Sequence, residues 1–109
     1  MRIEIIGDDS ISRQARIYAE YRLFAAVSQI VDIGRVKSAS LAVRRAPSRR
    51  SDNGVLCTVT VELNSGDVAR FRASGDHPYA AINRAVDRLR LNGRPVRPDA
   101  SHREMAAAE

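Results

Sequence analysis

Residues 75–91 decide the fold of this chain, with the sequence Gly-Asp-His-Pro-Tyr-Ala-Ala-Ile-Asn-Arg-Ala-Val-Asp-Arg-Leu-Arg-Leu. Asp76 is a good N-cap residue, because its carboxylate can accept hydrogen bonds from the free N–H groups of a first helical turn. Pro78 is tolerated at that position, where its missing donor costs nothing. Apolar residues then recur with helical spacing, at Ile82, Ala85, Val86 and Leu89. The stretch therefore predicts an amphipathic helix that packs through one stripe and carries arginine beside it.

Upstream of this helix, alternating apolar and polar residues predict four strands. Residues 2–6, 36–45, 55–63 and 68–74 each place apolar side chains on one side and polar side chains on the other. A tight hairpin turn at residues 64–67 joins the last two strands. Because every strand alternates, the sheet should have one face in solvent and one face covered by helices.

A second helix is predicted over residues 12–29, capped by Ser10 or Ser12. We expect its buried face to hold the larger apolar residues, namely Ile17, Tyr21, Phe24 and Val27, with Ala15, Tyr18 and Ala25 beside them. Among the aromatic residues, the core is predicted to include Tyr18, Tyr21, Phe24 and Phe71. Tyr79 could stack on a base, but we expect it to pack against the sheet.

These elements define an α+β two-layer sandwich of order β-α-β-β-β-α, with a four-stranded sheet and both helices on one face. A single domain over residues 1–93 is expected, because Gly93 suits a helix C-cap and Pro95 cannot continue the helix. Residues 94–109 have no core-facing stripe and are predicted to form a flexible tail.

Composition excludes several function classes. Cys57 is the only cysteine and the chain has two histidines, so neither a disulfide framework nor a thiolate metal cluster is available. No glycine-rich phosphate loop and no nucleophile–base pair are present. We therefore expect a non-enzymatic protein without a metal or cofactor. The chain shows no signal peptide and no apolar run long enough to span a membrane, which predicts a cytoplasmic protein.

Basic residues give the stronger functional indication. The formal net charge is +5, the pI is near 10.3, and 17 of the 18 basic residues are arginine. Arginine suits bidentate phosphate contacts, although the codon usage of a GC-rich genome gives the same bias. One arginine group lies around the first hairpin at residues 44–50. Two others lie on the helical side, and we predict RNA binding by Arg13, Arg16, Arg22, Arg84, Arg88, Arg90 and Arg94.

Part of the sequence resembles a known family. The run Asp76-His77-Pro78-Tyr79-Ala80-Ala81-Ile82-Asn83 is similar to the start of the last helix in ribosome hibernation-promoting factors. Residues 59–63 and the opening residues 3–7 are also similar to that family. The chain departs from it at Asn83, where aspartate is usual, and at Gly93 and Pro95, which shorten the last helix.

The resemblance implies a partner and a function. It implies a short, non-enzymatic factor that binds the small ribosomal subunit and its rRNA, blocks the mRNA and tRNA channel, and silences idle ribosomes under stress. Two alternatives remain open from the residues themselves. One is a general RNA- or DNA-binding module of the same fold, and the other is a protein-interaction domain in which the arginines only confer solubility.

Overall fold

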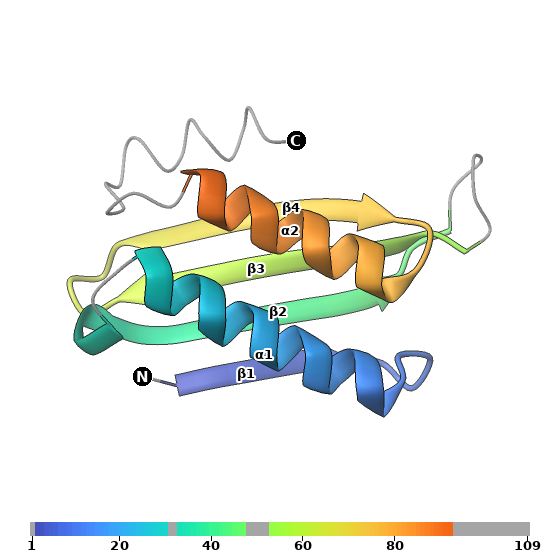
Figure 1. Ribbon diagram of the computed structural model, residues 1–109, viewed down its shortest axis with the longest axis horizontal. Helices are drawn as coiled ribbons and strands as arrows, with labels where there is room; N and C mark the ends of the chain where they lie inside the picture. Colours follow the sequence, from blue (N-terminus) through green and yellow to red (C-terminus); the bar gives the residue numbers. More distant parts are fainter. Residues whose placement is uncertain (1, 31–32, 48–52, 93–109) are drawn as a thin grey trace.

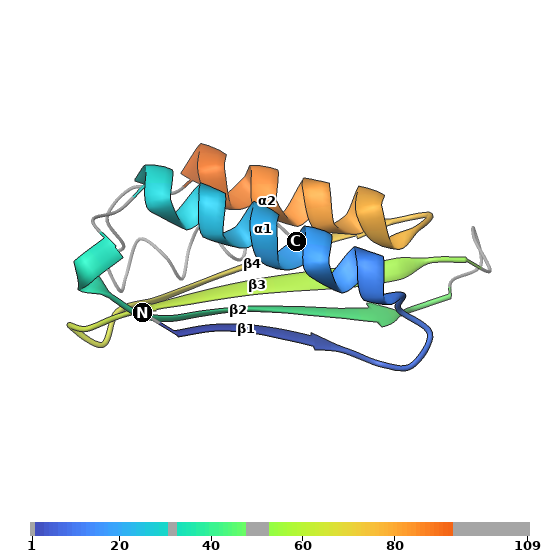
Figure 2. The same cartoon turned by 60° about the horizontal axis from the view of Figure 1, so that its bottom comes forward.

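The computed structural model describes residues 2–30, 33–47 and 53–92, which form two layers (Figures 1 and 2). One layer is a four-stranded sheet, and the other is a pair of helices lying side by side across one face of it. The elements in chain order are β1 (Arg2–Gly7), α1 (Arg13–Ile30), the short 3-10 helix η1 (Ile33–Arg35), β2 (Val36–Arg45), β3 (Val55–Leu63), β4 (Val68–Gly75) and α2 (Pro78–Asn92). The predicted class and element order are confirmed.

The sheet has the strand order β1-β2-β3-β4. β1 pairs parallel with β2, because α1 carries the chain back along the sheet between them, whereas the two hairpins make the other pairs antiparallel. One row of partners runs Ile5, Leu41, Val59 and Phe71 across all four strands. This row faces the helices, and its two central members, Leu41 and Val59, are completely buried.

The predicted buried face of α1 is confirmed for Val27 and Ala15, and partly for Tyr18, but it is wrong for its other large residues. Ile17, Tyr21 and Phe24 are 58%, 70% and 49% exposed, so they point into solvent and not toward the sheet. The buried stripe consists mainly of small residues, namely Ala15, Ala19, Leu23, Ala26 and Val27. Apolar residues occupy most of the circumference of α1, so periodicity does not select a face. The alanines allow the helix to lie close to the sheet, and larger side chains there would overfill the core.

The helix starts are fixed by side-chain caps. Ser12 Oγ accepts a hydrogen bond from the Ala15 amide at 3.1 Å, which confirms Ser12 as a cap of α1. In α2 the cap is His77, whose Nδ1 accepts from the Ala80 amide at 3.2 Å, and the prediction of Asp76 is wrong by one residue. Pro78 is the first helical residue, and it holds His77 out of the helical region, as an N-cap requires.

Gly75 sets the close approach of β4 to α2. A Cβ at this position would lie 2.8 Å from the Ala80 Cβ and 2.8 Å from the Ala81 amide nitrogen. The chain can therefore turn from the last strand directly into the helix only with glycine here. This turn places α2 over β3 and β4, beside α1 (Figure 1).

Candidate nucleic-acid interface

Arg16 holds the loop between β1 and α1. Its Nη2 donates to the Gly7 and Asp8 carbonyl oxygens, at 2.9 Å each. An arginine in the first turns of a helix interacts unfavourably with the helix macrodipole. Here the hydrogen bonds from Arg16 to the carbonyl oxygens of the preceding strand and turn offset that cost. Arg16 thus has a structural contact, which the sequence did not indicate, and its role in RNA binding stays a prediction.

Arg22 belongs to a polar network between the two helices. Asn83 Oδ1 accepts from the Tyr18 hydroxyl at 2.6 Å and from Arg22 Nε at 3.1 Å. Arg22 Nη2 also lies 3.4 Å from Asp87 Oδ1, in an ion pair at the surface. The residues involved are more than 60 positions apart in the chain, and only the packing of α1 beside α2 brings them together.

Arg84 and Arg88 both turn toward the outer edge of the sheet. Arg84 Nη1 donates to the Ser74 carbonyl at 2.8 Å, and Arg88 Nη1 donates to the Arg72 carbonyl at 2.7 Å. These carbonyls belong to β4, an edge strand, so no neighbouring strand pairs with them. The two arginines therefore cover the edge of β4 and lie on the opposite side of α2 from α1.

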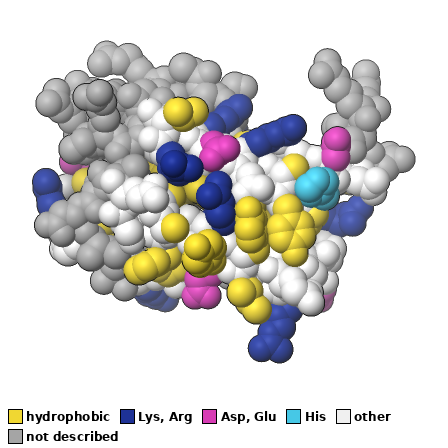
Figure 3. Space-filling model, viewed as in Figure 1, with side chains coloured by type: hydrophobic (Ala, Val, Ile, Leu, Met, Phe, Trp, Pro, Cys, Tyr) yellow, Lys and Arg dark blue, Asp and Glu magenta, His cyan; other side chains and the backbone are white. Residues whose placement is uncertain are grey.

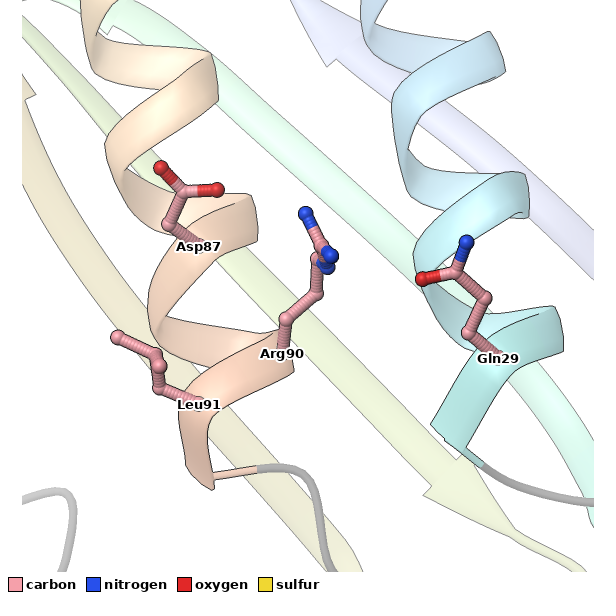
Figure 4. A pocket seen from close by; sticks show the side chains of 4 residues that line it. All are labelled: Gln29, Asp87, Arg90 and Leu91. Atoms are coloured by element: carbon pink, nitrogen blue, oxygen red, sulfur yellow. The ribbon is translucent and has the colours of Figure 1, made fainter.

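Arg13 and Arg90 are the most available of the predicted RNA-binding residues. Both are exposed, and within the described part of the chain neither forms a hydrogen bond or an ion pair. Arg90 lines a groove of about 510 Å³ near the C-terminal ends of the helices, together with Gln29 of α1 and with Asp87 and Leu91 of α2 (Figure 4). Arg94 lies outside the described residues.

The charge on the helical layer is strongly positive. α1 and α2 carry six arginines against two carboxylates, Glu20 and Asp87. Figure 3 shows Lys and Arg side chains beside exposed apolar side chains on the face that the helices cover. The open face of the sheet also carries arginine, at Arg2, Arg44, Arg70 and Arg72. Arginine alone therefore does not distinguish the two faces.

No catalytic or metal-binding arrangement emerges from the described residues. Cys57 is fully buried on β3, and burial raises the pKa of its thiol to about 12, which keeps it protonated and unreactive. The described part of the chain holds no group of three or more His, Cys, Asp or Glu side chains that could bind a metal ion. Neither α1 nor α2 has the length and the apolar character needed to cross a membrane.

The fold and the site together define a class: a two-layer α+β domain with an arginine-rich helical face. No protein-family model matches the sequence, and comparison with curated proteins gives no match. Among solved structures, the chain matches a ribosomal subunit interface protein from Coxiella burnetii with a TM-score of 0.62 and 15% identity. The match covers 84% of this chain and 91% of that one. The two proteins share a fold, in agreement with the resemblance to hibernation-promoting factors carried by α2.

Proposed function

We propose that this protein is a non-enzymatic, ribosome-associated factor that binds the rRNA of the small subunit through its helical face. The single observation that carries the proposal is the shared fold with a ribosomal subunit interface protein, over nearly the whole of both chains. The six arginines on α1 and α2 supply the cationic surface that an rRNA groove needs. As a cytoplasmic, basic, folded domain, it acts sterically by occupying the path of mRNA and tRNA.

The experiment that tests this proposal is co-sedimentation of the protein with isolated ribosomal subunits across a salt series. We expect saturable binding to the small subunit that weakens steeply with salt, because each phosphate contact releases counterions. Messenger RNA or tRNA should compete with it. Failure to bind either subunit at low salt would refute the proposal.

Charge reversals on the two faces identify the surface used. The variant Arg13→Glu/Arg90→Glu changes the helical face at residues without described structural contacts. Its matched control, Arg2→Glu/Arg44→Glu, changes exposed residues on the open face of the sheet that also have no described structural contacts. Each pair lowers the net charge from +5 to +1, because every reversal removes two units. We expect roughly tenfold weaker binding for the helical variant only.

Two other functions correspond to distinct outcomes of the same experiment. Equal affinity for ribosomal subunits and for unrelated duplexes would indicate a general nucleic-acid-binding module. Binding that does not depend on salt would indicate a protein-interaction domain, since phosphate contacts impose a steep negative slope.

A further inference from the structure

Three large apolar side chains stand in solvent on the outer face of α1. Ile17, Tyr21 and Phe24 follow one another at intervals of four and three residues, so they form a continuous ridge. Their exposed fractions are 58%, 70% and 49%. The core beneath α1 is already filled by its alanine stripe, and packing of the domain therefore does not require these side chains. A contiguous exposed apolar ridge of this kind is typical of a binding surface.

The aromatic residues of the chain are concentrated on the helical side. Of the three tyrosines and two phenylalanines, only Phe71 is fully buried, and Tyr18 is partly buried and packs against the core. Tyr18, Tyr21, Phe24 and Tyr79, which we call the aromatic belt, all lie on α1 or α2. Figure 3 shows apolar side chains gathered on this face of the molecule. Tyr18 and Tyr79 join the two helices edge to face, with ring centroids 5.1 Å apart. The belt is thus a preformed surface of rings, and Tyr21 is its most exposed member.

Cations border the belt. Arg13 lies one helical turn before Ile17 on α1, at the N-terminal end of the ridge. Arg90 and Gln29 lie together at the groove beyond its C-terminal end (Figure 4). Two carboxylates also lie nearby, Glu20 on α1 and Asp87 at the groove, but the six arginines of the two helices outnumber them. A strand of single-stranded RNA alternates flat bases with phosphates, and aromatic rings interleaved with guanidinium groups complement both.

We propose that the aromatic belt stacks unpaired RNA bases, while Arg13 and Arg90 contact the phosphates at its two ends. This inference rests on the proposed RNA-binding function and adds a preference to it: single-stranded or splayed RNA over duplex. In an A-form duplex the base faces are covered by their neighbours, so the rings have nothing to stack on. A second copy of the chain is the poorer occupant, because it brings two molecules of charge +5 together.

Binding of a short oligouridine, and of an RNA duplex of the same length, tests the inference on the full chain at fixed salt. The informative pair of variants is Tyr21→Leu, which keeps apolar area but removes the ring, and Tyr21→Phe, which keeps the ring. Tyr21 has no described hydrogen bond to lose. Ile6→Ala, on the open face of the sheet, is the control for loss of exposed apolar area.

We expect the unmodified chain to prefer the oligouridine, and Tyr21→Leu to weaken that binding roughly tenfold, in the range measured for loss of one base–aromatic stack. Tyr21→Phe and Ile6→Ala should bind as the unmodified chain does. The duplex affinity should be the same for all four proteins, because it depends on charge alone.

The other outcomes are distinguishable. If Tyr21→Leu binds oligouridine normally and salt still weakens the binding, the stacking is refuted while the RNA-binding function stands. If Tyr21→Leu loses ribosomal subunits but keeps its affinity for protein-free RNA, the belt contacts a protein and the stacking is again refuted. If Tyr21→Leu converts a dimer to a monomer, the belt is a self-interface. If the unmodified chain binds neither RNA nor subunits, both proposals fail.

Discussion

His77 is a single residue on which the start of α2 depends. Its Nδ1 accepts the Ala80 amide, and the following proline keeps His77 in the extended conformation that a cap needs. We expect His77→Ala to lower the free energy of unfolding by about 1 kcal/mol, and His77→Asp to restore it, because a carboxylate caps equally well. Asp76→Ala should cost less than about 0.5 kcal/mol. Urea denaturation measures the free energy of unfolding of all three variants. A larger loss for Asp76→Ala than for His77→Ala would show that Asp76, and not His77, is the N-cap.

Cys57 reports on opening of the core. It pairs with Val43 and Ala73 on the neighbouring strands, and burial raises the pKa of its thiol from 9.0 to about 12. Since only the thiolate reacts, a thiol reagent at neutral pH should label the native protein no faster than the domain unfolds. The raised pKa also makes the free energy of unfolding depend on pH, because the thiol loses its proton more easily in the unfolded chain. Below pH 9.0 this effect is absent, and the free energy of unfolding falls as the pH rises from 9.0 toward about 12. Fast labelling without denaturant would contradict this account of β3.

At the scale of elements, the strands and α2 were predictable but the orientation of α1 was not. In β3, strict alternation from Val55 to Leu63 leaves only one register with a buried face. In α2, arginine and aspartate mark the exposed side, so the apolar stripe is unambiguous. In α1, both the alanine stripe and the aromatic stripe have helical spacing, so either could face the sheet. Which stripe is buried depends on the space between α1 and the sheet, and the spacing of residues along the chain does not determine that space.

The edge of β4 depends on α2 for its cover. Because Arg84 and Arg88 donate to the Ser74 and Arg72 carbonyls, Arg84→Glu/Arg88→Glu would place carboxylates against those oxygens. We expect this variant to be roughly 1–2 kcal/mol less stable than the unmodified chain, and Arg84→Gln/Arg88→Gln to be affected less, since glutamine can still donate. Arg13→Glu/Arg90→Glu should stay within about 0.5 kcal/mol. Thermal unfolding compares them; equal stability of all variants would mean that the edge contacts contribute nothing.

For the whole molecule, composition predicted an anion-binding protein, whereas the arrangement of the proposed binding face emerged only from the fold. The excess of arginine is visible in the sequence. Which guanidinium groups are engaged was not visible, because Arg16, Arg22, Arg84 and Arg88 all contact residues at least eight positions away. The aromatic belt was missed for the same reason as the face of α1: large apolar residues were assigned to the core by default.

The boundary of the domain is the last property to test. Every buried apolar residue that the structure describes lies between Ile11 and Leu89, so a chain of residues 1–93 should keep the core intact. We expect its free energy of unfolding to stay within about 0.5 kcal/mol of the full chain, measured by urea denaturation. A larger loss would mean that residues 94–109 belong to the folded unit.

The removed segment holds three arginines and three carboxylates, so the net charge of +5 does not change. Any fall in RNA affinity on truncation would therefore come from specific contacts such as those predicted for Arg94, and not from lost charge.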